Sequence, residues 1–280
     1  MSDAETHRTQ AIRDTEMATP HRYSIWPKDP AAHLFEVRVT VADPDSQGQV
    51  FAMPAWIPGS YMIRDYAKHV VTARAESDGR DVALEKLDKS RWQAAAADRE
   101  LTLVLEVFAL DESVRGAHLD LTHAFFNGTC VFPAVVGQED IPCKLEIMEP
   151  EKPVGKNWRV ATSMSRNGAD KYGFGSYIAD DYAELIDHPV EVGELSIGEF
   201  EVRGVPHAIA IRGKTRADMA RLCHDLHTIC DHHMSFLGTP GDLDRYLFLL
   251  NAPGSGYGGL EHRWSSALIC GRDNLPARGD

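Results

Sequence analysis

The strongest candidate for chemistry in this sequence is a glycine-rich segment over residues 249–262. An apolar stretch leads through the loop Ala252–Gly256 into five residues with strand character: Gly258, Gly259, Leu260, Glu261 and His262. Glycines on a strand often mark the place where another backbone comes close, and an extended peptide can add itself to such an edge. Glu261 would then offer a carboxylate to a free ammonium group, an attraction of about 4 kcal/mol at about 4 Å and an effective dielectric of about 20. A glycine-rich hairpin with a surface glutamate explains the same spacing, which by itself favours that simpler interpretation.

Histidines are the next candidates, because four of the 13 lie close together at His224, His227, His232 and His233. The zincin pattern H-E-x-x-H is absent, since no histidine in the sequence is followed by glutamate. On a helix, His224 and His227 lie on the polar flank, whereas His233 falls on the apolar stripe. The four side chains therefore do not converge as a tetrahedral site requires. We expect no metal site in this chain, and zinc binding by this helix is a weaker alternative.

Other catalytic patterns are also missing. The run Gly254-Ser255-Gly256 is not the G-x-S-x-G elbow of serine hydrolases. The glycine loop is not a phosphate-binding loop, because no Gly-Lys-Ser/Thr follows it. We therefore assign no catalytic residue to this chain.

The elements before residue 213 are predicted to be mostly strands. Apolar and polar residues alternate over Phe35–Val41, the pattern of a half-buried strand. Further candidate strands are Leu101–Leu110, Trp158–Thr162, Phe200–Arg203 and Ala208–Arg212. Many short strands separated by turn residues predict an antiparallel sandwich or open sheet.

The pattern changes at Thr215. Thr215 and Asp218 resemble a capping box, and apolar residues then recur at helical spacing until Gly238 and Pro240. These features predict an amphipathic helix over Arg216–Leu237, followed by strands at Tyr246–Leu250 and Gly258–Ile269. We expect an α+β protein with a disordered tail at 1–20, a β domain at 21–212 and a second domain at 213–280.

Four segments together carry a family resemblance. Gly258–His262 resembles the G-x-M-E-N motif of gluzincin aminopeptidases, in the variant G-G-L-E-H of the glycyl aminopeptidase family (metallopeptidase family sixty-one). Trp56–Tyr66, Phe125–Phe132 and Asp187–Gly193 resemble further segments of that family, in the same order. The four motifs cover most of residues 22–270, which reverses the preference for a plain hairpin.

The resemblance implies a fold and a reaction. The fold is an N-terminal β domain followed by a thermolysin-like catalytic domain. The reaction is that of a hydrolase, a zinc metallopeptidase that removes N-terminal glycine or alanine from a peptide. Zinc would polarise the scissile carbonyl and activate a water, with a glutamate as general base. Glu261 would hold the substrate amine, and the backbone of Gly258, Gly259 and Leu260 would pair with the peptide and help stabilise the oxyanion.

Two departures qualify the resemblance. His262 stands where the wider superfamily has asparagine, which is normal for this family. The H-E-x-x-H helix, which follows this strand by a few tens of residues in the family, is missing. We therefore expect a truncated chain, inactive alone and without bound zinc, although the intact enzyme uses zinc. A natural non-catalytic relative, acting as a peptide- or partner-binding β module, is the alternative.

The upstream motifs also have structural explanations. Trp56–Tyr66 is predicted to be a turn set by Pro58-Gly59, with Arg64 in a local ion pair. Asn127-Gly128 is the best hairpin signal in the chain. Glu191 either joins Glu261 at the substrate amine or caps a loop.

The amino-acid composition limits the classes of partner that we expect. The net charge of −13 disfavours nucleic acid, which needs clustered Lys and Arg. Residues 1–20 lack an apolar signal region, and no stretch approaches about 18 apolar residues, so we expect no membrane partner. Five cysteines without a CxxC pair suit reduced thiols in a cytoplasm. The expected partner is a peptide with a free N-terminus; the oligomeric state is open.

Overall fold

The structure, a computed structural model, describes residues 19–151 and 154–277. Most of the tail expected over residues 1–20 lies outside this described part. Strands dominate, and they form four sheets. The predicted α+β class, with an N-terminal β region, is confirmed.

The largest sheet has eight strands in the order β14-β15-β12-β1-β2-β8-β4-β5. Their bounds are β1 His21–Asp29, β2 Leu34–Val41, β4 Val70–Ser77, β5 Arg80–Val82, β8 Leu101–Phe108, β12 Cys143–Ile147, β14 Ser165–Arg166 and β15 Gly175–Ala179. All neighbours pair antiparallel except β1 and β12, which run parallel.

The predicted alternation of β2 explains the main core. Phe35, Val37, Val39 and Val41 are all buried, while the residues between them are only partly covered. Each pairs with a buried apolar residue of β8, as Val39 does with Leu103. Because side chains alternate across a strand, one face of both strands enters the same core.

Two four-stranded sheets complete the N-terminal region. One has the order β11-β3-β7-β6 and the other β13-β16-β10-β9. Their bounds are β3 Val50–Ala52, β6 Leu84–Lys86, β7 Arg91–Ala94, β9 Ala117–Leu119, β10 His123–Phe126, β11 Ala134–Val135, β13 Arg159–Ala161 and β16 Val190–Gly193. Short helical turns connect them: η1 Tyr66–His69, α2 Gly128–Val131 and α3 Tyr182–Ile186.

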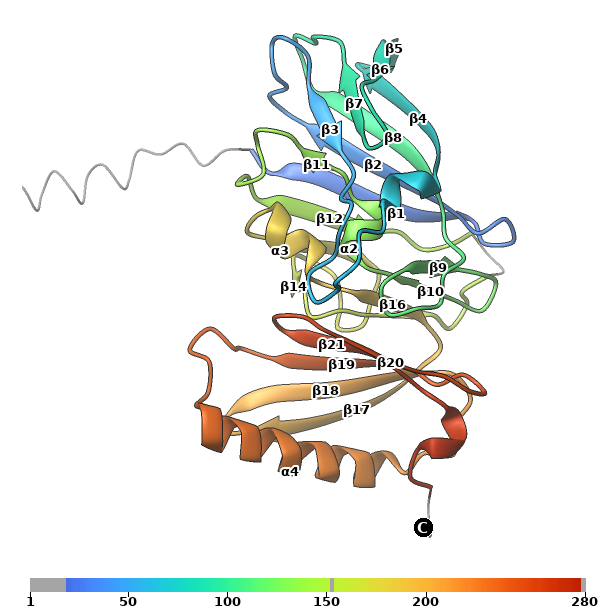
Figure 1. The fold of residues 1–280 in the computed structure, drawn as a ribbon, viewed down its shortest axis with the longest axis vertical. Helices are drawn as coiled ribbons and strands as arrows, with labels where there is room; N and C mark the ends of the chain where they lie inside the picture. Colours follow the sequence, from blue (N-terminus) through green and yellow to red (C-terminus); the bar gives the residue numbers. More distant parts are fainter. Residues whose placement is uncertain (1–18, 152–153, 278–280) are drawn as a thin grey trace, which may run out of the picture.

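The fourth sheet contains β17-β18-β19-β21-β20 and lies between the N-terminal region and a long helix (Figure 1). Its elements are β17 Leu195–Val202, β18 Val205–Arg212, α4 Met219–Leu237, β19 Tyr246–Asn251, β20 Tyr257–Glu261, β21 Ser265–Cys270 and η2 Arg272–Asn274. On β18, Ala208 and Ala210 face the N-terminal region, whereas Ile209 and Ile211 pack under α4. The sheet is thus apolar on both faces.

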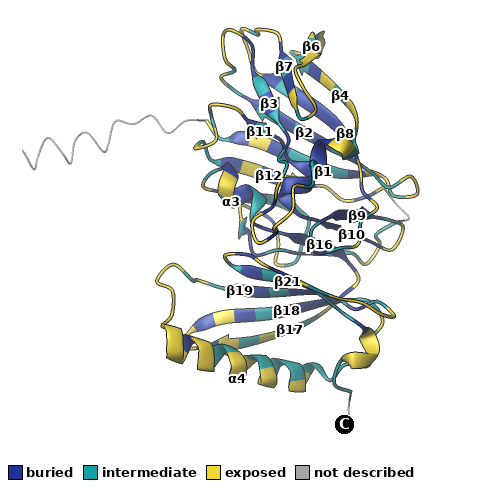
Figure 2. Cartoon of the chain, in the orientation of Figure 1, coloured by how far each residue is buried: buried dark blue, intermediate teal, exposed yellow. Residues whose placement is uncertain are grey.

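The helix differs in detail from the prediction. α4 begins three residues later than the expected Arg216–Leu237, because Asp218 and not Thr215 is its N-cap. The Asp218 carboxylate accepts hydrogen bonds from the second and third N–H groups of the helix. From residue 229 on the inward stripe is shifted by one position, to Cys230 and Met234, so His233 is exposed, contrary to expectation. Figure 2 shows much of α4 as exposed.

One strand prediction differs from the structure. The segment Gly258–Ile269 is not one strand but two, β20 and β21, which pair antiparallel. The domain boundary at residue 213 stays a prediction. The five-stranded sheet includes strands on both sides of that residue, because β17 and β18 pair into the same sheet as β19.

Asn127 and Gly128 form no hairpin turn, so that prediction is wrong. Asn127 is buried, precedes α2 and donates hydrogen bonds from Nδ2 to the carbonyls of Val114 and Gly116. Gly128 lies so close to Ile186 that a Cβ atom would come within 2.6 Å of its Cα. Close packing therefore explains this Asn-Gly pair. No helix among residues 19–151 and 154–277 is long and apolar enough to cross a bilayer.

Candidate functional site

The strand β20 forms one edge of the five-stranded sheet. It pairs with β21 on one side only, in a register that sets Gly259 opposite Leu268 and Glu261 opposite Ser266. Leu260 is buried in the main core and anchors the strand. No strand within the described part of the chain lies beside the other edge of β20, and an extended peptide can add to such an edge.

Glu261 lies at the end of this edge with an exposed side chain. Across the strand pair, Ser266 shares a 2.7 Å hydrogen bond with the hydroxyl of Tyr246. Burial is the main cause that raises the pKa of Tyr246, and the negative charge of Glu261 adds to it. Glu261 therefore stands beside two hydroxyl groups that can share in polar contacts to a ligand.

The Trp56–Tyr66 loop lies directly against β20. Gly59 has a φ of +79°, and a Cβ atom there would lie 2.8 Å from Leu260 Cδ1 and 3.5 Å from Glu261 Oε1. A side chain at this position would be strained and would collide with Leu260. The structure therefore brings the first and last motifs of the sequence together.

The expected ion pair of Arg64 is not formed within the described residues. Its Nε instead donates to the hydroxyl of Ser60 at 3.3 Å, and the neighbouring Asp65 pairs with Lys89 at 2.8 Å. Beyond this turn the loop displays exposed apolar side chains. They are Trp56, Tyr61, Met62 and Ile63, and Tyr257 of β20 is exposed as well.

Arg115 is a neighbour of β20 that sequence reasoning missed. Its guanidinium donates a 3.1 Å hydrogen bond to the carbonyl of Gly259. One acceptor of the edge is thus already engaged by a partly buried side chain. No local pattern around Arg115 indicates this contact, because the two residues lie 144 positions apart.

His262 points inward, not toward the surface where a substrate would lie. Its side chain is buried, and Nδ1 lies 3.0 Å from Asp187 Oδ1. The second oxygen of Asp187 accepts from the backbone N–H of Arg263 at 3.1 Å. Asp187 therefore fixes the turn after β20, so the third motif positions the fourth.

Glu191 is fully buried on β16 and caps no loop. Burial raises its pKa to about 8, against the opposing effect of the nearby Arg212. It lines a cavity of about 10 Å³ with Glu112, His118 and His123, and the lining of that cavity does not include Glu261. The structure does not bring Glu191 and Glu261 together in one described pocket.

A histidine cluster lies in the same place. His118 on β9 and His123 on β10 are buried and stacked, with ring centroids 4.4 Å apart. Asp120, in the turn between the two strands, lies 3.2 Å from a ring nitrogen of each. Burial lowers the pKa of His123 to about 3, so this ring is neutral at pH 7. The sequence signal for this cluster is a histidine on each side of a turn that begins with Asp120.

The four clustered histidines of α4 are all exposed: His224, His227, His232 and His233. None of them is among the described residues that could share one metal ion. The described residues that could do so are Glu112, His118 and His123, whose ligand atoms lie within 4.8 Å of one another. The described residues that could hold an ion therefore lie on β9, on β10 and in the loop before β9, and not on α4.

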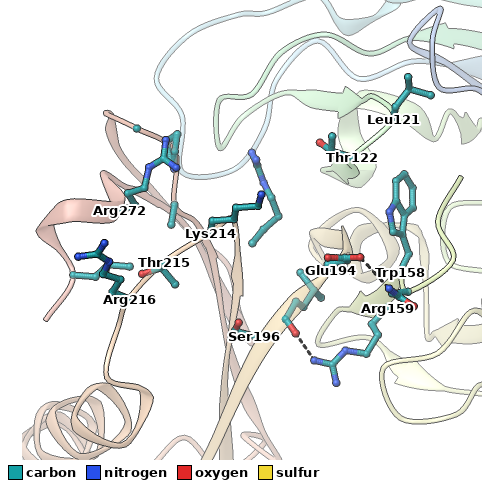
Figure 3. A pocket seen from close by; sticks show the side chains of 18 of the residues that line it. Leu121, Thr122, Trp158, Arg159, Glu194, Ser196, Lys214, Thr215, Arg216 and Arg272 are labelled. Atoms are coloured by element: carbon teal, nitrogen blue, oxygen red, sulfur yellow. Dashed lines mark hydrogen bonds between the residues drawn. The ribbon is translucent and has the colours of Figure 1, made fainter. Parts of the chain in front are cut away.

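A large open cleft of about 1810 Å³ lies elsewhere, between the start of the glycine loop and the N-terminal region. Figure 3 shows Arg216 and Arg272 on one side of this cleft and Trp158 and Arg159 on the other. Among the described residues that line it, none belongs to Gly258–His262. The cleft is therefore not the candidate peptide site.

Comparison with known proteins supports the sequence resemblance. The family model for the Peptidase M61 N-terminal domain matches residues 22–194. A solved structure, an aminopeptidase N family protein from Idiomarina loihiensis, shares 39% sequence identity at a TM-score of 0.89. The match covers 93% of this chain and 44% of that protein.

More distant structures share the fold. A mutant M1 zinc metallopeptidase from Deinococcus radiodurans, alone and bound to a Tyr-Ser-Ala substrate, gives TM-scores of 0.54 and 0.53 at 10% identity. These matches cover 90% and 94% of this chain and 60% and 61% of those proteins. The chain thus spans less than two thirds of each of these three structures. No curated protein matches it.

Proposed function

Because the chain belongs to the M61 peptidase family through its N-terminal domain, we propose that it supplies the peptide-holding part of an aminopeptidase. In this proposal an extended peptide adds to the free edge of β20. Its amino end reaches Glu261, and the backbone of Gly258, Gly259 and Leu260 pairs with the peptide. The preferred N-terminal residue is glycine or alanine.

The observation that carries this proposal is the position of β20. It is an edge strand whose free side ends in an exposed carboxylate, and the Trp56–Tyr66 loop lies beside that carboxylate. The backbone groups supply affinity for any extended chain, whereas the carboxylate distinguishes a free amine from a blocked one. Arg115 must release the Gly259 carbonyl if a peptide is to use it.

Because Glu261 is exposed, it can contribute only a small free energy to the binding of a peptide amine. An attraction of about 4 kcal/mol needs partial shielding from water, and exposed ion pairs are worth about 0.2–1 kcal/mol. We therefore expect only a ~2–5-fold preference for a free amine in this chain. A stronger preference requires that the site be covered.

Zinc chemistry is not assigned to residues of this chain. The zinc peptidase ligand pattern H-E-x-x-H is absent, since none of the 13 histidines is followed by glutamate. The residues present do not fit the catalytic zinc of this enzyme type, so we derive no hydrolytic step here. Zinc-dependent hydrolysis belongs to our proposal for the whole protein. We also propose a cytoplasmic location, which the free cysteines suit.

A non-catalytic peptide-binding module is the second candidate function. The same edge strand favours it, because binding at β20 needs no metal. The two candidates separate when the gene is read beyond codon 280: an in-frame H-E-x-x-H supports the peptidase, and a stop codon supports the module.

The proposal is tested by NMR titration of the chain with Gly-Ala-Ala and with its N-acetylated form. We expect amide shifts centred on Gly258–His262 and tighter binding of the free peptide. Glu261→Gln should abolish the difference between the two peptides, since it removes the charge but keeps the shape. Glu201→Gln is the matched control, an exposed glutamate on the opposite edge strand β17. Equal affinities of the wild-type chain for both peptides would exclude Glu261 as the amine anchor.

A further inference from the structure

We propose that Glu112, His118 and His123 form a binding site for one divalent transition-metal ion, between the N-terminal β region and the five-stranded sheet. The three side chains offer ligand atoms within 4.8 Å of one another. Two histidines and one carboxylate are ligands that Zn²⁺ and related ions accept.

The geometry requires the ligand atoms to move closer by about 1 Å. Ligand atoms bonded to one tetrahedral ion at about 2.0–2.2 Å lie about 3.3–3.6 Å apart, whereas these lie within 4.8 Å of one another. His118 and His123 are held in place by burial on neighbouring paired strands. Glu112 is exposed and lies in the loop before β9, so its carboxylate can move inward to complete the set.

Asp120 supplies His123 with the outer contact that metal-binding histidines usually have. Its Oδ1 lies 3.2 Å from His123 Nδ1, and a carboxylate on one ring nitrogen orients the imidazole and leaves the other nitrogen for the metal. Its Oδ2 lies 3.2 Å from His118 Nε2 but forms no hydrogen bond with it. The oxygen beside His123 also accepts hydrogen bonds from the backbone and side chain of Thr122, which fix its position.

Unpaired polar atoms point to a ligand in the cavity. Both ring nitrogens of His118, Glu191 Oε1 and Asn251 Oδ1 are buried and have no hydrogen-bond partner among the described residues. All three residues line the same cavity, which is closed by β19 and β21. Buried polar atoms without partners are costly, so a group in this cavity would satisfy them. The volume of about 10 Å³ suits a single ion or a single water.

The charges favour a cation over a water. Glu112, Asp120 and Glu191 are three carboxyl groups, and one guanidinium, that of Arg212, lies near them. Arg212 Nη2 lies 3.3 Å from Glu112 Oε1. The other carboxylate oxygen of Glu112, Oε2, is therefore left for another partner. Glu112 and Asp120 alone outnumber this guanidinium, and the excess negative charge favours a cation over a neutral water.

The test is zinc titration of the chelator-stripped 280-residue chain by calorimetry at pH 7.5, with thermal unfolding of the stripped and loaded forms. We expect one Zn²⁺ per chain and a higher Tm in the loaded form. Co²⁺ should replace it and give visible absorption without a thiolate charge-transfer band, because no cysteine is among the three ligands.

The variants His118→Gln and His123→Gln should weaken binding by more than the ~10–100-fold that loss of an outer contact costs. Glu112→Gln changes an exposed residue, so it should fold normally, and it should also weaken zinc binding. If a variant of a buried histidine unfolds, Glu112→Gln still tests whether these residues bind the ion. The double variant His224→Ala, His227→Ala removes exposed histidines of α4 and should bind as the wild type does. The absence of stoichiometric binding, or binding that Glu112→Gln and His118→Gln leave unchanged, would overturn the proposal and leave a water as the occupant.

Discussion

The charge state of a glutamate in this protein, and its access to a ligand, depend on how far the residue is buried. Glu261 and Glu191 are both glutamates on strands, yet Glu261 is exposed whereas Glu191 is enclosed. Exposure keeps Glu261 available to a ligand and makes its attraction weak. Enclosure holds a proton on Glu191, because the charged form loses its hydration.

Glu191 therefore makes stability depend on pH. Its folded pKa of about 8 exceeds the unfolded value of 4.5, so the folded state binds more protons between these values and loses stability as pH rises. In chelator, Glu191→Gln should remove a decline of at most about 1.4 kcal/mol per pH unit. Urea unfolding of both proteins between pH 7 and 8 measures this, because the two proteins share every other titrating group. Parallel pH profiles of the two proteins would contradict the burial of an unpaired Glu191.

At the scale of elements, the contact between α4 and β17 depends on a glycine. A Cβ atom on Gly198 would lie 2.6 Å from Cys223 Sγ and 2.6 Å from Met219 Sδ. The helix can rest this close to the sheet only because Gly198 has no side chain. The interface is therefore sensitive to a single added methyl group.

We expect Gly198→Ala to lower the free energy of unfolding by about 1–3 kcal/mol, the usual cost of overpacking. Gly241→Ala is the control, since nothing lies within 4 Å of a Cβ atom there and its φ is ordinary. Urea titration monitored by circular dichroism compares the three proteins. If Gly198→Ala were as stable as Gly241→Ala, α4 would not pack as closely as described.

At the scale of the whole molecule, apolar side chains gather beside an open strand edge. Tyr61, Met62, Ile63 and Tyr257 are all more than half exposed, and the loop that carries the first three contacts β20. Exposed apolar patches and unpaired edges both favour association. This part of the molecule has the properties of a surface that another chain covers.

We expect the chain to self-associate through this patch at high concentration. The double variant Met62→Ser, Ile63→Ser should shift the association constant toward monomer by about tenfold or more, because it removes apolar area that association would bury. Sedimentation velocity over a concentration series measures the shift. Val71→Ser is the control, an exposed apolar residue on β4 of the eight-stranded sheet. An equal effect of both changes would mean that association does not use the loop beside β20.

The sequence by itself determined the local elements and the family. Alternation over Phe35–Val41 predicts β2, helical spacing predicts most of α4, and four motifs in order predict the M61 resemblance. These are properties of residues near one another in the chain, where periodicity reports directly which side chains share a face. The role of Glu261 remains a prediction, because it depends on a bound peptide.

Only the tertiary structure decided which distant residues meet. It places Asp187 on His262, Gly59 beside Glu261, and Glu191 in the cavity of His118 and not in a described pocket with Glu261. The sheet orders that create these contacts join strands far apart in the sequence, and spacing along the chain contains no measure of such distances. For the same reason the sequence shows the four clustered histidines of α4 but not the convergence of His118 and His123, which lie on two paired strands.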